Sequence, residues 1–239
     1  MKWVAAITTV ILGLFSNHKP QAPSPIEAQI TRTSPFSPSP DPGEGNQKEG
    51  VLLSVPFTSQ APFGEWGDPR HQDGCEEAAS LMAVLAMRQV TMTKPQFSRE
   101  IEKIWEWEVK NYGSGVDTSA EDTAERIIGG YFNNFKYQIS NIKYYGEIVD
   151  ELAKGNVVIV PVDGRGLNPN YTAPGPERHM ILIRGYDDET GEFITNDAGT
   201  RRGEKYRYKY EVLFKAVRDY PTGDHVPITS VDKRMIVIQ

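Results

Sequence analysis

Cysteine is almost absent from this sequence, since Cys75 is the only one in 239 residues. A single cysteine excludes an intrachain disulfide, so the fold has to be stabilised by packing. Positive charge is also scarce, because 26 lysines and arginines stand against 32 acidic residues and leave a net charge of −6. Binding to a phosphate backbone rests on clustered lysine and arginine, so the composition argues against nucleic acid as the main partner.

A long apolar run is missing as well. The run from Trp3 to Phe15 follows one lysine and is shorter than the roughly 20 residues of a comfortable membrane span. It fits the apolar region of a secretory signal, although no clear small-x-small cleavage pattern follows it. We therefore expect an exported protein, either secreted or tethered to the outer face of the cytoplasmic membrane. Residues 1–16 would be a signal peptide or an N-terminal anchor, the only contact with a membrane that we expect.

The next segment, residues 17–50, is rich in proline, serine and small polar residues. Such a composition cannot bury enough apolar surface to fold, so we expect a flexible linker that holds the downstream domain away from a membrane or wall. A degraded pro-segment would have a similar composition. The folded part is then one domain, residues 51–239.

Secondary-structure patterns divide this domain into two halves. Apolar periodicity and capping signals predict helices in the first half: 73–89, Thr93 to Val109, after Thr118 up to Gly129-Gly130, and 145–154. β-Branched or alternating runs predict strands near Val51 and through the second half: 156–162, 179–186, 191–197, 204–210 and the C-terminal RMIVIQ. Helices followed by antiparallel strands indicate an α+β domain and not a doubly wound sheet.

Cys75 lies in the stretch DGCEEAASLMAVLAMRQ, at the predicted first turn of a buried helix. Unpaired backbone N–H groups and the positive end of the helix dipole favour a thiolate there and can hold an oxyanion. Cys75 is thus a candidate nucleophile. The alternative is a packed thiol, because free cysteine commonly behaves as a small buried hydrophobe.

A cysteine nucleophile needs a base within hydrogen-bond reach and a group that fixes the base. The sequence offers four histidines. His18 lies in the linker, His71 in a loop before the cysteine helix, and His225 in a late loop without a rigid setting. His179 opens an apolar strand and is the strongest base candidate.

The hairpin after His179 indicates the third group. If Asp187 to Gly191 form a five-residue loop, Asp197 falls opposite Ile181 and is a diagonal neighbour of His179, within side-chain reach. A loop shorter by one residue would reverse the parity and turn Asn196 toward His179 instead. Asn196 is therefore the alternative orienting residue.

Two other features have weaker meaning. His71, Asp73, His179 and Asp197 could be written as metal ligands, but they have no compact ligand spacing, and we expect no metal and no cofactor. The segment from Asp163 to Arg178 leads directly into His179, and it could be a lid or substrate-contacting loop or a plain surface excursion.

These residues carry a family resemblance. The order Gln60, Cys75, His179, Asp197 and the phrases VPFTSQAPFGEW, GCEEAASLM and HMILIRGYDDETGEFITNDAG are similar to papain-like cysteine peptidases. More narrowly, they resemble exported bacterial relatives of the bacteriocin-processing peptidases, cysteine peptidase family thirty-nine, from about Val51 to Gln239. The resemblance implies a papain-like fold and cofactor-free acyl transfer through a thioester. It also implies Cys75 as nucleophile, His179 as base, Asp197 as orienter and Gln60 as oxyanion donor.

The sequence departs from that family at two motifs. Glu76 and Glu77 follow the cysteine where Gly-Pro is common, and Ala198 follows the aspartate where proline is common. The acidic pair would oppose thiolate formation unless it faces solvent, although a helix N-terminus accommodates acidic residues well. A transporter portion is also missing, so a peptide-exporting role does not carry over.

Three functions remain from the sequence. The first is an exported cysteine peptidase that hydrolyses a peptide or protein substrate. The second is a thiol acyltransferase or amidase that uses the same residues on cell-wall material. The third is a tethered binding domain with an inactive site.

Overall fold

The computed structural model describes residues 31–32, 50–167 and 171–239. The expected signal or anchor, residues 1–16, lies outside them, and so does most of the expected linker. Within that linker, β1 (Thr31–Arg32) pairs with β3 (Val90–Thr91) in a two-stranded sheet. No helix of the described residues has the length and apolar character needed to cross a membrane.

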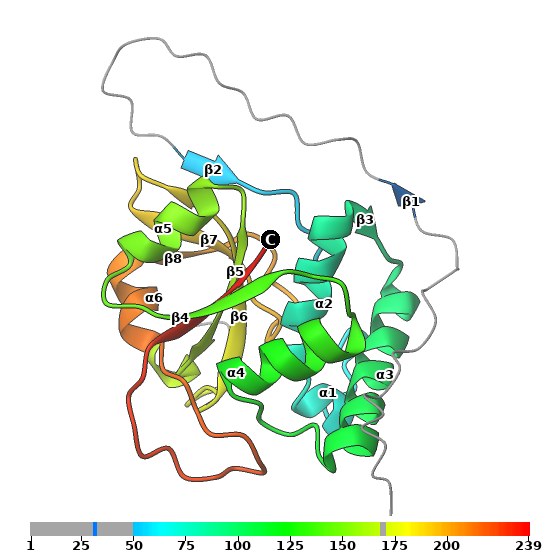
Figure 1. Ribbon diagram of the computed structural model, residues 1–239. Coiled ribbons are helices and arrows are strands. Elements are labelled where there is room, and N and C mark those ends of the chain that lie inside the picture. Colours follow the sequence, from blue (N-terminus) through cyan, green and yellow to red (C-terminus); the bar gives the residue numbers. More distant parts are fainter. Residues whose placement is uncertain (1–30, 33–49, 168–170) are drawn as a thin grey trace, which may run out of the picture.

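A seven-stranded antiparallel sheet runs through the middle of the domain (Figure 1). Its order is β4-β9-β5-β6-β7-β8, and β2 pairs with the C-terminal end of β6. The strands are β2 (Gly50–Leu52), β4 (Tyr137–Asn141), β5 (Val157–Val162), β6 (His179–Asp187), β7 (Glu192–Asn196), β8 (Tyr206–Lys209) and β9 (Arg234–Ile238).

Helices cover both faces of this sheet (Figure 1). On one side lie α1 (Pro69–Gln72), α2 (Cys75–Arg88), α3 (Lys94–Tyr112), α4 (Ala120–Asp122) and the π-helical η1 (Thr123–Tyr131). On the other lie α5 (Gly146–Ala153) and α6 (Tyr210–Ala216), and the short η2 (Gly164–Gly166) follows β5. The first half is therefore helical and the second half mostly sheet, which confirms the predicted α+β class.

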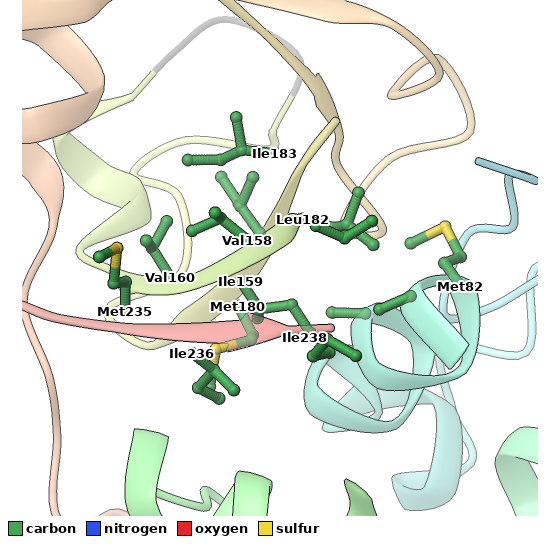
Figure 2. Packing of buried hydrophobic residues seen from close by; sticks show 14 of the residues in the cluster. Met82, Val158, Ile159, Val160, Met180, Leu182, Ile183, Met235, Ile236 and Ile238 are labelled. Carbon is green, nitrogen blue, oxygen red and sulfur yellow. The ribbon is translucent and has the colours of Figure 1, made fainter. Parts of the chain in front are cut away.

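The core lies on both faces of β5 and β6, two strands that are almost wholly buried. In Figure 2, Val158 and Ile183 point to one side of the sheet, while Ile159 and Met180 point to the other. Met82 of α2 packs against this second side. The helix that begins with Cys75 is thus fixed against the strand that begins with His179.

The predicted cap of α3 is confirmed. The Thr93 side chain accepts a hydrogen bond from the backbone of Gln96, and the Gln96 side chain accepts one from the backbone N–H of Thr93. Gly113 ends the helix in a left-handed conformation with φ of 85°.

The predicted end of the third helix is wrong. Ser119, and not Thr118, caps α4, and the chain continues helically through Gly129-Gly130 to Tyr131. A Cβ on Gly130 would lie 2.6 Å from the Trp107 ring, and one on Gly129 would lie 3.0 Å from the Tyr137 ring. These glycines therefore allow close packing of aromatic rings and do not stop the helix.

The hairpin between β6 and β7 differs from the prediction in two compensating ways. Asp187 pairs with Glu192, so the loop is one residue shorter than expected. The sequence prediction would then turn Asn196 toward His179. However, Arg184 is an extra residue in a β-bulge between Ile183 and Gly185, and beyond it Leu182 pairs with Asn196. The bulge restores the expected register, and Asp197 follows on the same face as His179.

Other elements of the second half differ from the sequence prediction. The strand expected over 204–210 ends at Lys209, because Tyr210 begins α6. No strand was predicted at β4, which is half exposed and polar. The C-terminal strand β9 inserts between β4 and β5, so an edge strand like β4 is stabilised by a segment nearly 100 residues later in the chain.

Candidate active site

Cys75 is the first residue of α2, where the sequence predicted it. Gly74 caps the helix, and a Cβ there would lie 2.5 Å from the carbonyl oxygen of Arg70. Only glycine therefore lets α1 turn directly into α2 at this point. The Cys75 side chain is 6% exposed and lies on the wall of a cleft.

His179 is the first residue of β6 and is 2% exposed. Its Nε2 lies 2.8 Å from Oδ1 of Asp197. The Tyr171 ring packs edge-on against the imidazole, with centroids 5.5 Å apart. The ring is thus held from two sides.

Asp197 is completely buried and accepts hydrogen bonds at both oxygens. Besides His179, Oδ1 accepts the backbone N–H of Gly199 at 3.1 Å, and Oδ2 accepts the hydroxyls of Tyr208, at 2.8 Å, and Tyr171. Burial alone would raise the pKa of this carboxyl, but His179 and the two hydroxyls lower it below its ordinary value. An ionised Asp197 can only accept, so Nε2 of His179 carries the proton and Nδ1 is left as the proton acceptor.

A cleft of about 810 Å³ joins these groups. Cys75, Gln60 and His179 all line it, together with Tyr171, Thr172 and residues 175–178. The segment before His179 is therefore part of the cleft wall, and its contact with a substrate stays a prediction, while residues 168–170 lie outside the described residues.

Gln60 reaches the cleft, but its amide has other partners. Nε2 donates to the carbonyl oxygens of His71 and Gln72, at 3.0 and 2.8 Å, while Oε1 is buried without a partner. Both amide hydrogens are thus used in holding α1. In this state the side chain has no free N–H to offer to an oxyanion.

The side chain of Asn196, the alternative orienting residue, is hydrogen-bonded to other parts of the fold and not to His179 among the contacts of the described residues. Its Nδ2 donates to the carbonyl oxygen of Pro56 at 3.0 Å, and its Oδ1 accepts from Arg184 at 3.2 Å and from the backbone of Lys205 at 3.3 Å. These contacts tie β7 to β6 and to the segment before α1. The carboxylate beside His179 is that of Asp197.

The expectation that the helix N-terminus would favour a thiolate is wrong for this state. Glu76 and Glu77 are 2% and 0% exposed, so the acidic pair faces the interior and not solvent. Burial raises the pKa of the Cys75 thiol well above its ordinary value, and the neighbouring Glu76 and Glu77 raise it further. The thiol donates to Oε2 of Glu76 at 2.9 Å.

Two other histidines have better defined settings than the sequence suggested. His71 is buried on α1, with Nδ1 2.7 Å from the carbonyl oxygen of Gln60 and Nε2 3.2 Å from Glu102. His225 lines the cleft in a left-handed conformation, and Oδ2 of Asp117 accepts from both its backbone N–H and Nδ1. Among the described residues, no group of three His, Cys, Asp or Glu side chains is placed to hold a metal ion.

Sequence reasoning missed the hydroxyls of Tyr171 and Tyr208 as partners of Asp197. Tyr208 lies in an alternating strand, EKYRYKY, and this two-residue period is the one signal in the sequence that indicates which of its tyrosines face inward. Tyr171 lies in an irregular segment, where no periodic pattern indicates which side chain turns inward. Asp117, the partner of His225, was missed too, because it lies in the irregular segment after α3, where no sequence pattern indicates its contacts.

Comparison with known proteins identifies the family of this chain. The family model described as peptidase C39-like matches residues 52–221, well over half of the chain. The chain belongs to the peptidase C39-like family. This confirms the family resemblance, and it makes the domain one of a peptidase family.

A solved structure agrees with the peptidase C39-like assignment at the level of the fold. A crystal structure of a candidate C39-like peptidase from Bacillus anthracis is similar with a TM-score of 0.51 and 15% sequence identity. The similarity covers 80% of this chain and 98% of that one. No curated protein matches this chain.

Proposed function

We propose that this domain is a cysteine peptidase in which Cys75 is the nucleophile, His179 the base and Asp197 the residue that orients the base. The observation that carries the proposal is the 2.8 Å contact between Nε2 of His179 and Oδ1 of the buried Asp197, because His179 lines the same cleft as the only thiol of the sequence. That contact leaves Nδ1 of His179 to take the thiol proton.

The reaction follows from these roles. Transfer of the proton from Sγ of Cys75 to Nδ1 of His179 lets Sγ attack the carbonyl carbon of a peptide bond. The backbone N–H of Cys75 is among the first amides of α2, which lack acceptors inside the helix, and it donates to the oxyanion. The imidazolium then protonates the leaving amine, and a thioester forms. Water, deprotonated by His179, hydrolyses the thioester and regenerates the thiol.

Gln60 is the proposed second oxyanion donor. Its side chain reaches the cleft, and its two amide hydrogens are bonded to α1 in the described state. To serve the oxyanion it has to exchange one of these carbonyl acceptors for the substrate oxygen.

The proposal includes action outside the cytoplasm. It is supported by the apolar N-terminal run after a lysine and by the Pro/Ser-rich segment that follows it. Fractionation of cells that produce the full chain tests this part, and recovery only in the cytoplasm would contradict it.

The catalytic roles are tested with a peptide library and cell-wall fragments, with products identified by mass spectrometry. The variants are Cys75→Ala and His179→Ala, and the matched control is His225→Ala, a second cleft histidine with its own aspartate. We expect peptide cleavage by the wild type and the control at both pH 5.5 and 7.5, with no cleavage by Cys75→Ala. Loss of the base lowers the rate of His179→Ala by about 10²-fold or more.

Two results would contradict the proposal. Cleavage of peptides by folded Cys75→Ala would exclude the thiol as nucleophile. Products from wall fragments alone, lost in Cys75→Ala, would assign the same residues to an amidase or acyltransferase acting on cell-wall material.

A further inference from the structure

Glu76 holds the thiol that the proposed mechanism needs. Its Oε2 accepts the Cys75 thiol at 2.9 Å, and its Oε1 accepts the hydroxyl of Tyr220 at 2.7 Å. The Glu76 side chain is 2% exposed, and Tyr220 is 3% exposed. Both carboxylate oxygens are therefore used, one by the nucleophile and one by a fixed phenol.

The position of Tyr220 is fixed by the residue before it. Oδ1 of Asp219 accepts the backbone N–H of Tyr220 at 2.9 Å and that of Ala120 at 3.0 Å. This joins the segment after α6 to the start of α4. The Glu76 carboxylate thus lies between Sγ and a held Tyr220 hydroxyl, and its rotation away from Sγ would also disturb the hydrogen bond to Tyr220.

The titratable groups around Glu76 lie on several elements. Cys75 and Glu77 lie on α2 itself, Glu108 on α3, Asp117 in the loop after α3, and Tyr220 after α6. Among these groups there is no cation to compensate the Glu76 charge. Burial raises the pKa of Glu76, although hydrogen bonds from Cys75 and Tyr220 oppose the rise.

We propose that Glu76 is a positioning residue that keeps Cys75 in the resting enzyme as a thiol directed to its own carboxylate, and that protonation of Glu76 releases this thiol to His179. The inference rests on the proposed function, since it assigns a form of regulation to the same site. Glu76 touches no substrate and acts only through Cys75.

Proton counting gives the direction of the pH effect. Three groups share the protons: Sγ of Cys75, the carboxylate of Glu76 and Nδ1 of His179. In the resting state they hold one proton, which lies on Sγ. In the released state Sγ has given its proton to Nδ1 of His179, and a second proton from solvent lies on Glu76. Because the released state binds one proton more, it gains population as the pH falls. An ordinary thiol behaves in the opposite way, since its thiolate fraction falls with the pH.

Alkylation of the intact protein by iodoacetamide tests this without a substrate. Because Cys75 is the only cysteine, the intact mass reports one site. For the wild type we expect the alkylation rate to rise as the pH falls from 8 to 5.5. In Glu76→Gln, which keeps the shape and removes the charge, we expect a flat profile and a rate at pH 7.5 about tenfold or more above wild type. The like charge of Glu76 disfavours the thiolate, and relief of about one pKa unit changes the thiolate population about tenfold.

The matched control is Glu77→Gln. Glu77 is the next residue on α2 and is equally buried, but no hydrogen bond joins it to Sγ among the described residues. We expect this variant to keep the acid-dependent rise. A wild-type rate that falls with the pH as for glutathione would overturn the proposal, and this result does not depend on whether a variant folds. A Glu76→Gln profile identical to wild type would overturn it as well.

These outcomes differ from those of the peptidase test. If Glu76→Gln changes the alkylation profile but no peptide is cleaved by any form, the control of the thiol stands and the peptidase function fails. If the wild type cleaves peptides and His179→Ala does not, while the alkylation profiles of wild type and Glu76→Gln coincide, the function stands and the role of Glu76 fails.

Discussion

At the scale of single residues, the position of the His179 imidazole depends on Gly199, which has no side chain to occupy the space beside the ring. A Cβ on Gly199 would lie 2.9 Å from Cε1 and 3.0 Å from Nε2 of His179, and 3.1 Å from the Tyr171 ring. The His179 ring is buried and the half-buried Tyr171 ring packs against it, so an added methyl group would have to displace one of the two rings. Gly199, two residues after Asp197, leaves the space in which the His179 ring and the Asp197 carboxylate meet.

We therefore expect Gly199→Ala to displace the imidazole from Asp197 and to lower kcat by about 10² if the shift approaches 1 Å. The measurement is the rate of peptide cleavage per mole of folded protein. Gly67→Ala is the matched control, because a Cβ at Gly67 would have no neighbour within 4 Å. Equal rates for the two variants would show that the contact at Gly199 does not position His179.

At this scale, sequence reasoning placed Cys75 at a helix start and His179 at the start of an apolar strand, and the structure confirms both positions and brings the two residues to one cleft. Sequence reasoning also selected them as nucleophile and base, which stays a prediction. It failed for Glu76, because whether a first-turn glutamate points to solvent or to the interior is decided by α3 and by the segment after α6, which lie far away in sequence.

At the scale of elements, the position of Asp197 depends on the β-bulge at Arg184 in β6, for which the sequence contains no recognisable signal. The short hairpin loop alone would have turned Asn196 to the His179 face, and the extra residue Arg184 reverses this. Arg184 is 5% exposed, and its guanidinium donates to the carbonyl oxygen of Leu53 and to Oδ1 of Asn196. Its buried contacts hold the irregularity in place.

Deletion of Arg184 should therefore remove the bulge and turn the face of residues 179–183 relative to β7. We expect loss of peptide cleavage together with a strongly lowered melting temperature. The control is Arg184→Ala, which keeps the register and loses only hydrogen bonds of about 1.5–3 kcal/mol each. We expect it to be less stable but active per folded molecule. A folded deletion variant with wild-type activity would contradict the role of the bulge.

At the scale of the whole molecule, Glu76 and Glu77 of α2 and Glu108 of α3 form a buried acidic layer, which affects both the candidate site and the stability of the fold. Glu77 of α2 and Glu108 of α3 are both 0% exposed, and no hydroxyl, amide or cation of the described residues bonds to either carboxyl group. Each can bond only to the other, when one of them holds a proton. Burial, followed by the charge of Glu76, raises the pKa of Glu108 to about 8.

The α+β class was predictable because periodicity and β-branched runs are local signals, and the sheet order was not. The strand β9 enters the sheet between β4 and β5, and the acidic layer forms only when α2 packs on α3. A glutamate in a helical pattern indicates a solvated face by default. Its burial is a property of the assembled molecule.

This layer makes the stability of the folded protein depend on pH. In the unfolded chain a glutamate titrates near pH 4.3, whereas the folded state keeps Glu108 protonated up to about pH 8. The free energy of unfolding should then decrease as the pH rises from about 4.5 to 8, by up to about 1.4 kcal/mol per pH unit. Below this window both states are protonated and the group has no effect.

Glu108→Gln removes the titrating group and leaves an amide that can donate to Glu77. We expect its melting temperature to fall less than that of the wild type between pH 5 and 8. Glu106→Gln, an exposed change on the same helix, should follow the wild type. Thermal melts at each pH, followed by circular dichroism, measure this. Parallel curves for wild type and Glu108→Gln would mean that Glu108 is ionised in the folded state over this pH range, and that any proton shared by the pair is held by Glu77.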